Sequence, residues 1–283
     1  MKKHKEKIFK IIFLATACTS ILAVALICVF LFANGIPAIA EIGVFDFLLG
    51  EKWRPANDIY GILPMILGSI YVTAGAIIIG VPIGVLTAIF MAKFCPKWLY
   101  KILHPALELL AGIPSVIYGF FGLIVVVPIV SDLFGGSGKS MLTASILLGI
   151  MILPTIIGVS ESAIRAVPQS YYEGGLALGA SHERSVFFAT VPAAKSGIMA
   201  GVVLGIGRAI GETMAVIMVA GNQAMMPKGV VKGIRTLTAN IVIEMGYAAD
   251  LHREALIATA VVLFVFILII NLTFSLIKRR MDK

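Results

Sequence analysis

The segment Pro168–Pro192 reads PQSYYEGGLALGASHERSVFFATVP, and it forms a polar island between long apolar runs. Ser170 and Glu173 have the S-x-x-E spacing of a capping box, in which each side chain satisfies a free amide of the first helical turn. Pro168 ends any helix that precedes it, because proline lacks the amide hydrogen that a continuing helix needs. The pattern therefore predicts a short helix that begins near Tyr171.

Two glycines give this predicted helix a bare flank. Gly175 and Gly179 are four residues apart and are therefore expected on one face. Glycine inside a helix costs up to about 1 kcal/mol relative to alanine. Two glycines on one face therefore indicate that another element, or another protein, approaches the helix closely there.

The composition of the whole chain defines its class. The 283 residues are 59% hydrophobic and 13% charged, and their mean hydropathy is +1.02. Soluble domains are typically about half apolar and about a quarter charged. A soluble protein of this length has no interior large enough to bury so much apolar surface. We therefore predict an all-α membrane protein in which residues 1–283 form a single integral membrane domain.

Six apolar runs approach or exceed the roughly 20 residues that a helix needs to cross the hydrocarbon core. They cover residues 11–33, 63–92, 105–130, 142–164, 197–221 and 254–277. The first run follows a basic tail, as the apolar core of a signal peptide does, but such a core is about 7–15 residues long. This run is longer and has no convincing cleavage site after it. We therefore predict that it is a retained first span.

The basic residues are unevenly distributed among the connecting segments. Fifteen of the 23 Lys and Arg residues lie in the N-terminal tail, the 93–104 loop, the polar island with its flanks, and the C-terminal tail, whereas seven lie in the other loops. Because cytoplasmic loops carry the excess of Lys and Arg, both termini and Pro168–Pro192 are predicted to be cytoplasmic. The net charge of +8 then reflects topology. We expect membrane lipid as a partner and no nucleic acid.

The two longest loops on the opposite side cover residues 34–62 and 222–253. The first contains enough apolar residues for an amphipathic helix lying on the membrane surface, namely Phe45, Phe47, Leu48, Leu49 and Trp53. Such a helix either anchors the interface or contacts a partner, and we favour the anchor. In the second loop, Ile234–Met245 is compatible with a partly re-entrant helix.

The fifth apolar run contains the candidate substrate-pathway residues, Arg208 and Glu212. Gly201, Gly205, Arg208 and Glu212 step by four, three and four residues, which predicts one shared helix face. An arginine in mid-membrane costs at least roughly 2.5–3.5 kcal/mol, so it normally faces protein or a water-filled cavity. One interpretation is an Arg208–Glu212 ion pair that holds two helices together. The other, which we favour, is a pathway that carries a ligand, because Arg before Glu is the less favourable order within one helix.

Glycines in the same run predict close helix packing, and a second charged pair predicts a clamp. The packing candidates are Gly201, Gly205, Gly207 and Gly211, because small residues let membrane helices approach closely. Glu161 and Arg165 are also four residues apart, in the favourable order, and are predicted to form a structural ion pair.

Other sequence patterns argue against an enzyme. The segment Gly136–Ser140 resembles the end of a phosphate-binding P-loop, but Leu133 stands where the motif needs its first glycine. The three cysteines imply no disulfide framework, and the four histidines show no ligand spacing. No nucleophile–base arrangement can be placed on one face. We expect neither a metal nor another cofactor in this chain.

The polar island resembles the EAA motif, the cytoplasmic coupling loop of ABC importer permeases. Glu173 matches its acid, Gly179 its central glycine and Pro192 its terminal proline, all at the family spacing. Gly174 and Gly175 stand in place of its two alanines, and Ala189 and Val191 in place of its isoleucine and leucine. The resemblance implies that Glu173, Gly175, Gly179 and Pro192 couple the chain to an ATPase.

Further segments are similar to the channel-forming permease of the bacterial phosphate-specific (Pst) ABC importer, its C-type subunit more than its A-type sister. They are Trp53–Pro55, Tyr60–Pro64, Leu110–Gly119, Ile152–Thr155 and Gly207–Ala215. The resemblance implies a fold like that of type I ABC importer permeases, with six transmembrane helices, in the bacterial inner membrane. It also implies a heterodimer with the sister permease, two cytoplasmic ATPase subunits and an extracytoplasmic phosphate-binding protein.

The function expected from this resemblance is a channel subunit that moves inorganic phosphate into the cell at the expense of ATP hydrolysed by its partners. Two alternatives remain open. One is an ABC permease for another oxyanion, such as molybdate or sulfate. The other is a stand-alone secondary transporter, which needs no ATPase.

Overall fold

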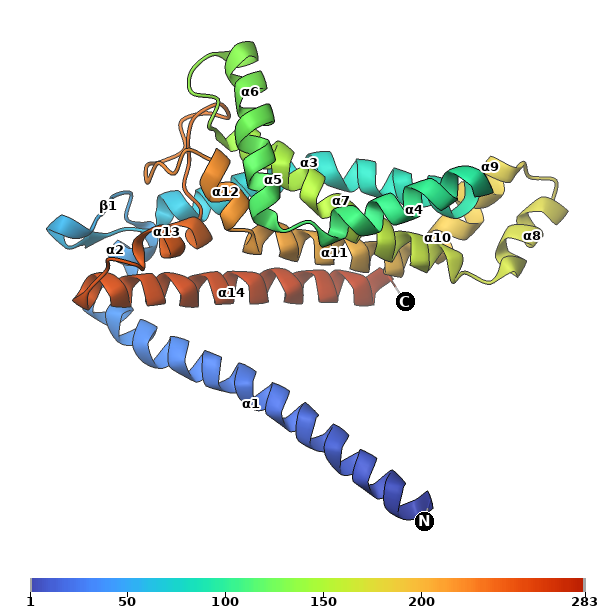
Figure 1. Ribbon diagram of the computed structural model, residues 1–283, viewed down its shortest axis with the longest axis horizontal. Helices are drawn as coiled ribbons and strands as arrows, with labels where there is room; N and C mark the ends of the chain where they lie inside the picture. The colour runs from blue at the N-terminus through green and yellow to red at the C-terminus, as the bar shows by residue number, and fades with distance from the viewer. Residues whose placement is uncertain (1, 282–283) are drawn as a thin grey trace.

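The computed structural model describes the backbone of residues 2–281 and the side chains of residues 9–276 (Figure 1). Its five longest helices are α1 (Lys2–Ile42), α3 (Leu63–Ile89), α7 (Met141–Arg165), α11 (Lys195–Gly211) and α14 (Asp250–Met281). The shorter helices are α2 (Val44–Leu49), α4 (Lys97–Gly112), α5 (Ser115–Phe121), α6 (Val127–Phe134), α8 (Gln169–Ala177), α9 (His182–Ser185), α10 (Val191–Ala193), α12 (Met214–Val219) and α13 (Leu237–Glu244). Strands β1 (Trp53–Arg54) and β2 (Ile59–Tyr60) form an antiparallel hairpin.

Three segments of π-helix lengthen these elements. Phe90–Phe94 continues α3, Gly122–Val126 joins α5 to α6, and Val186–Thr190 joins α9 to α10. The continuous helical segments that reach membrane-spanning length and hydropathy are Phe9–Ile42, Leu63–Phe94, Ser115–Phe134, Met141–Arg165 and Asp250–Leu276. A sixth is formed if His182–Ala193 and Lys195–Gly211 are one span, bent by 69°. The fold is therefore all-α with five or six candidate spans.

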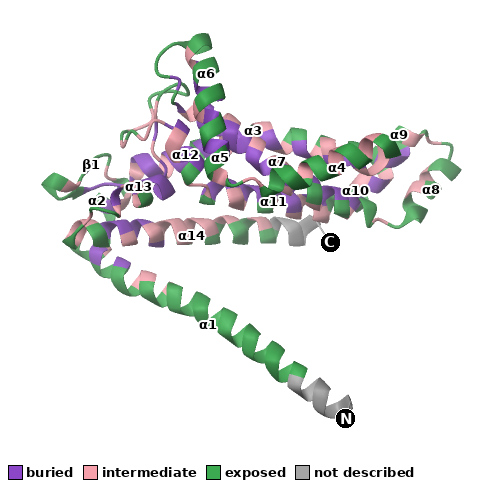
Figure 2. Ribbon diagram, in the orientation of Figure 1, coloured by how far each residue is buried: buried purple, intermediate pink, exposed green. Residues whose placement is uncertain are grey.

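The bundle core lies around α7, which packs between α3 and α11, while α14 runs along α11 (Figure 1). Glycines allow the close approach of α3 to α7. A Cβ at Gly80 would lie 2.8 Å from the carbonyl oxygen of Gly149, and one at Gly84 would lie 2.8 Å from the Ile156 side chain. Figure 2 shows the buried residues concentrated along α3, α7 and α13. The hairpin and α13 lie at one end of the bundle, and α8 and α9 at the other.

The first helix departs from the bundle (Figure 1). Residues 9–27 of α1 are exposed without interruption. Only the end of α1 near the hairpin packs on α14, where a Cβ at Gly35 would lie 2.6 Å from Val261 Cγ2. Residues 9–27 therefore contribute nothing to the core of the described chain.

The predicted third span is wrong in its boundaries. Residues 105–130 do not form one helix, because α4 ends at Gly112 and α5 begins at Ser115. Ile113 is extended, with ψ 126°, as expected for a residue that precedes proline. Pro114 lacks the amide hydrogen that would continue the helix. The span is Ser115–Phe134, and α4 is a separate helix without buried residues.

The predicted fifth span is also interrupted. Its run, residues 197–221, is helical to Gly211, extended at Glu212 with ψ 133°, and helical again from Met214. The Glu212 side chain accepts a hydrogen bond from the Ala215 amide at 3.1 Å. A glutamate that caps the next helix in this way stabilises a new helix start, which the apolar run alone does not reveal.

The amphipathic surface helix predicted in the first long loop is short. Residues 34–42 continue α1, Pro55–Asn57 form one 3₁₀ turn, and the separate α-helix is α2, with Phe47 fully buried and Phe45 79% exposed. Trp53 lies outside this helix, in β1, and is buried. In the other long loop, the expected helix is α13, which is shorter than the predicted range Ile234–Met245.

Candidate functional site

Arg208 lies in the last turn of α11, and its guanidinium turns toward α7. Its Nη1 donates to Thr155 Oγ1 at 3.3 Å, and both side chains are partly buried. Among residues 9–276, no carboxylate forms an ion pair with Arg208. A guanidinium has five donors in a planar fork, so most of its hydrogen-bonding capacity is available to a ligand or to water.

The prediction that Arg208 and Glu212 share one helix face is wrong. Gly201, Gly205 and Arg208 do follow one another along α11, but the helix ends at Gly211. Glu212 is extended and lies outside that helix, and its carboxylate accepts from the Ala215 amide in the first turn of α12. An Arg208–Glu212 pair within one helix is consequently not formed.

The four glycines of α11 fall into two groups. A Cβ at Gly201 would lie 2.9 Å from Ser160 Oγ, and one at Gly205 would lie 2.8 Å from Ile156 Cγ1, so both glycines allow α11 to pack on α7. Gly207 and Gly211 have no described atom within 4 Å of their Cβ positions. The helix therefore has one face packed inside the chain and one bare face.

A cavity of about 240 Å³ lies between α4 and α7. On α7 its lining runs from Pro154 to Arg165, and it includes no residue of α11. Arg165 Nε donates to Glu161 Oε1 at 2.7 Å, which confirms the predicted ion pair. Arg165 Nη2 also donates to the Met91 carbonyl at 2.8 Å. The pair thus ties α7 to the π-helical end of α3, and both of its residues line the cavity.

At the α8 end, the predicted capping box is absent. The N-cap of α8 is Pro168, it makes no side-chain cap, and the helix begins at Gln169. Ser170 therefore lies inside the first turn rather than before it. The serine that caps a helix in this segment is Ser181, which accepts from the Arg184 amide at 3.3 Å.

The two glycines of this segment have different roles. A Cβ at Gly175 would lie 2.7 Å from Ser185 Oγ, so α8 packs closely on α9 there. Gly179 has φ +83° and lies after the end of α8, not on its flank. The Gly179 amide donates to the Leu176 carbonyl and the Ala180 amide to the Gly175 carbonyl. These two bonds form a Schellman motif, which requires a left-handed residue at this position.

The connection between α8 and α9 is held by an aromatic contact and presents an apolar tip. Tyr172 Oη lies 2.8 Å from His182 Nδ1, and the Phe94 ring lies 4.8 Å from the His182 ring. Leu178 is 91% exposed, and Glu173 is exposed as well. Pro192 lies in α10, next to the 69° bend that leads into α11.

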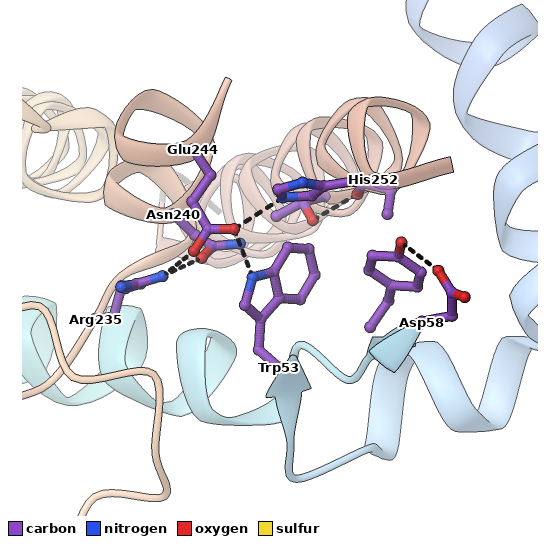
Figure 3. Close-up of polar contacts among 9 residues, drawn as sticks. Trp53, Asp58, Arg235, Asn240, Glu244 and His252 are labelled. Carbon is purple, nitrogen blue, oxygen red and sulfur yellow. Dashed lines mark hydrogen bonds and ion pairs between the residues drawn. The ribbon is translucent and has the colours of Figure 1, made fainter. Parts of the chain in front are cut away.

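At the hairpin end, four segments meet at the carboxylate of Glu244, which we call the Glu244 cluster (Figure 3). Trp53 Nε1 donates to Oε2 at 2.7 Å, His252 Nε2 lies 2.9 Å from the same oxygen, and Arg235 Nη1 donates to Oε1. Arg235 Nη1 also donates to Asn240 Oδ1 at 3.0 Å. Glu244 is 5% exposed, and removing one partner of such a buried charge typically costs about 3–5 kcal/mol.

The hairpin side of this cluster is also ordered by polar contacts. Tyr60 Oη donates to Asp58 Oδ1 at 3.2 Å. Burial, with the hydrogen bond and the charge of Asp58, raises the pKa of Tyr60 to about 12. The phenol therefore remains a protonated donor near neutral pH. The Trp53 and Tyr60 rings pack edge to face, with their centroids 5.6 Å apart. This aromatic contact holds the two strands of the hairpin together beside the cluster.

Comparison with known protein families identifies the type of protein that has this arrangement. The profile of the family described as binding-protein-dependent transport system inner membrane component matches residues 80–283.

The chain belongs to this family.

The permease has relatives along nearly its whole length. It is 40% identical to the probable ABC transporter permease protein YqgH of Bacillus subtilis, covering 91% of this chain and 88% of that protein. It is 36% identical to the phosphate transport system permease protein PstC of Mesorhizobium japonicum, covering 85% and 80%. It is 32% identical to the probable phosphate transport system permease protein PstC of Methanocaldococcus jannaschii, covering 96% and 94%.

Solved structures support the fold. A chain of the bacterial alginate ABC transporter, in complex with an alginate pentasaccharide-bound periplasmic protein, is 16% identical and superposes with a TM-score of 0.65, covering 95% of each chain. A chain of the inward-facing MetNI methionine ABC transporter is 17% identical, with a TM-score of 0.64, covering 82% of this chain and 100% of that one. The permease therefore has the fold of type I ABC importer permeases. It is a multi-pass inner membrane transport component and not an enzyme.

Within this permease, the geometry brings together some predicted site residues and separates others. Arg208 contacts Thr155, Gly175 contacts α9, and Gly201 and Gly205 contact α7, whereas Glu212 bonds the Ala215 amide and forms no ion pair with Arg208. The assignments of Glu173, Gly175, Gly179 and Pro192 to ATPase coupling stay predictions. Sequence reasoning missed the Glu244 cluster. Arg235 and Glu244, the charged residues of the stretch Ile234–Met245, were the available signal.

Variants at Gly179 test whether this turn needs a residue that tolerates a left-handed backbone. We expect Gly179→Leu to reduce transport strongly while the protein still inserts, because a left-handed leucine strains the backbone by roughly 1–2 kcal/mol. Gly179→Asn is the matched control, since asparagine tolerates this conformation. It should keep most of the activity. Transport assays normalised to membrane-inserted protein measure both. Equal activity of the leucine variant and the wild type would contradict a coupling role for this turn.

Proposed function

We propose that this permease is the channel subunit of an ATP-driven importer of inorganic phosphate. The observation that carries the proposal is Arg208, whose partly buried guanidinium lies within a candidate span and is engaged only by Thr155 among the described side-chain partners. Phosphate is bound best by a planar cationic fork that donates two parallel hydrogen bonds. A single such group attracts the anion without holding it too tightly for release. The names of the PstC relatives support the same substrate.

The partners in this proposal are a sister permease, two cytoplasmic ATPase subunits and an extracytoplasmic phosphate-binding protein. The bare face of α11 at Gly207 and Gly211 offers a second permease a surface for close helix contact. The exposed tip at Leu178 offers the ATPase an apolar anchor. The chain itself requires no cofactor in this scheme, because ATP is bound and hydrolysed by its partners.

Reconstitution tests the proposed function directly. The permease is purified with its partner subunits and placed in vesicles with the binding protein outside and ATP accessible to the ATPases. We expect uptake of labelled phosphate that requires ATP and is not competed by excess sulfate or molybdate. Uptake without ATP would instead favour a secondary transporter. Preferential uptake of sulfate or molybdate would show that the substrate is another oxyanion.

The proposed coupling requires that the α8 end is cytoplasmic, as the distribution of basic residues predicts. Single cysteines at exposed Ser137 and Ser170 test this in a chain whose natural cysteines (Cys18, Cys28 and Cys95) are replaced by serine. We expect a membrane-impermeant maleimide to label Ser137→Cys in intact cells, and Ser170→Cys only after permeabilisation. Labelling of Ser170→Cys in intact cells would contradict the orientation. Ser181 is unsuitable because its side chain caps α9.

A further inference from the structure

Helix α13 connects the Glu244 cluster to the break in the fifth apolar run. At its C-terminal end, α13 carries Glu244. Near its N-terminal end, Thr238 Oγ1 donates to the main-chain carbonyl of Glu212 at 3.0 Å. The two residues are six positions apart, about 9 Å along a helix axis. A single short helix therefore touches both the cluster and the break.

The Glu212 carbonyl is available to Thr238 because the chain leaves helical geometry at that point. Gly211 is the last residue of α11, and α12 does not begin until Met214. Arg208 lies four residues before this carbonyl, in the last turn of α11. The hydrogen bond from Thr238 therefore helps to orient the end of α11, which carries Arg208.

The N-terminal end of α13 is fixed by three further hydrogen bonds, one of them between the Thr236 and Thr238 hydroxyls, whose oxygens lie 3.1 Å apart. The Leu237 amide donates to Ser69 Oγ of α3 at 2.9 Å. Thr236 Oγ1 accepts from the Ala239 amide at 3.2 Å and caps the helix. These contacts fix the start of α13 to α3, while Glu244 fixes its other end.

The partners of Glu244 come from three other segments, namely the hairpin, the loop before α13, and α14 (Figure 3). Trp53 links the cluster to a hairpin whose other side borders a surface cavity of about 400 Å³, lined by Lys52 and by the acidic residues Asp46, Glu51 and Asp58. A protein docked on this surface would contact the hairpin that carries Trp53.

We propose that Glu244 and Thr238 are positioning residues that transmit docking of the external binding protein from the hairpin, through α13, to the Glu212 break beside Arg208. This inference rests on the proposed function, since it assumes an ATP-driven importer that responds to a loaded binding protein. Neither residue contacts the substrate in this scheme. Glu244 fixes the C-terminal end of α13. Thr238, near its N-terminal end, fixes the backbone carbonyl of Glu212, which orients the end of α11.

The experiment measures ATP hydrolysis by the reconstituted complex with and without phosphate-loaded binding protein. Thr238→Val removes the hydroxyl that donates to the Glu212 carbonyl and accepts from Thr236, with little change in volume. We expect the stimulated-to-basal ratio to fall about five-fold, the equilibrium factor of one ordinary hydrogen bond, while the basal rate and the amount of complex stay unchanged. Thr273→Val is the matched control, because its exposed hydroxyl bonds only the Ile269 carbonyl of its own helix. It should keep the wild-type ratio.

Glu244→Gln is the second variant, and exposed Glu254→Gln is its control. Loss of the charge that pairs with Arg235 should lower the stimulated-to-basal ratio at least as much as Thr238→Val does. If the Glu244→Gln complex does not assemble, Thr238→Val decides alone.

A wild-type ratio in Thr238→Val, or an equal fall of its basal and stimulated rates, would overturn this inference and leave phosphate import intact. A wild-type complex that phosphate-loaded binding protein does not stimulate would overturn the proposed function, and this inference with it.

Discussion

Phosphate uptake should fall to background when Arg208 is replaced by glutamine, while the complex still assembles. The guanidinium has Thr155 as its side-chain partner and no carboxylate, so its loss strands no buried charge in the described part of the protein. Two charge-assisted hydrogen bonds to phosphate contribute about 1.5–3 kcal/mol each, which corresponds to a loss of at least about 100-fold. Uptake into vesicles, normalised to assembled complex, measures the effect.

Two further variants distinguish a ligand site from a structural arginine. Arg208→Lys keeps the charge but loses the planar fork, so uptake should be clearly impaired. Thr155→Val removes only the neighbour of the guanidinium and should reduce uptake far less than Arg208→Gln does. If Arg208→Gln instead depletes assembled complex and the remaining complex transports normally, Arg208 has a structural role and the pathway assignment fails.

The second large effect is expected at Gly205, where a leucine should prevent accumulation of folded protein. A Cβ there would lie 2.8 Å and 3.0 Å from two carbons of Ile156, a fully buried residue of α7. Extra methylene groups in a packed core typically cost about 1–3 kcal/mol, and leucine adds a whole side chain at this contact. Size-exclusion chromatography of detergent-solubilised membranes should show loss of the monodisperse peak.

Gly207→Leu is the matched control for that variant, because it lies two residues away with no described atom near its Cβ position. We expect this chain to insert and to elute as the wild type does. If the bare face contacts the sister permease, Gly207→Leu should reduce copurification of that subunit. Equal loss of both leucine variants from the membrane would show that the glycine spacing does not separate a packed face from a bare one.

The sequence alone predicted the membrane class, the number of apolar runs and the family. Hydropathy accumulates over about 20 neighbouring residues, so it is a local property that the order of residues determines. The Glu161–Arg165 pair was predictable for the same reason, since residues four apart on a helix are neighbours in any tertiary context. Arg208 was recognisable as a candidate because a charge in an apolar run is costly wherever the helix packs.

The interruptions of the helices were decided by tertiary structure. Pro82, Pro114 and Pro154 all lie within predicted spans, yet α3 and α7 continue through theirs and only Pro114 marks a break. A proline leaves a carbonyl without its amide partner, and neighbouring segments determine whether the helix continues past it. Glu212 likewise ends one helix and caps the next, although its spacing from Arg208 suggested a continuous face.

The sequence showed the charges of the Glu244 cluster but not the residues that pair with them. Trp53 and Glu244 are 191 residues apart, and they meet because the hairpin and α13 pack at the same end of the bundle. No periodicity relates two residues so distant in the chain, because their separation depends on how several helices are arranged. Local spacing determined which segments are helical and apolar. The packing of those helices determined which charges are buried together, since a carboxylate far from water is stable only where donors from other segments converge on it.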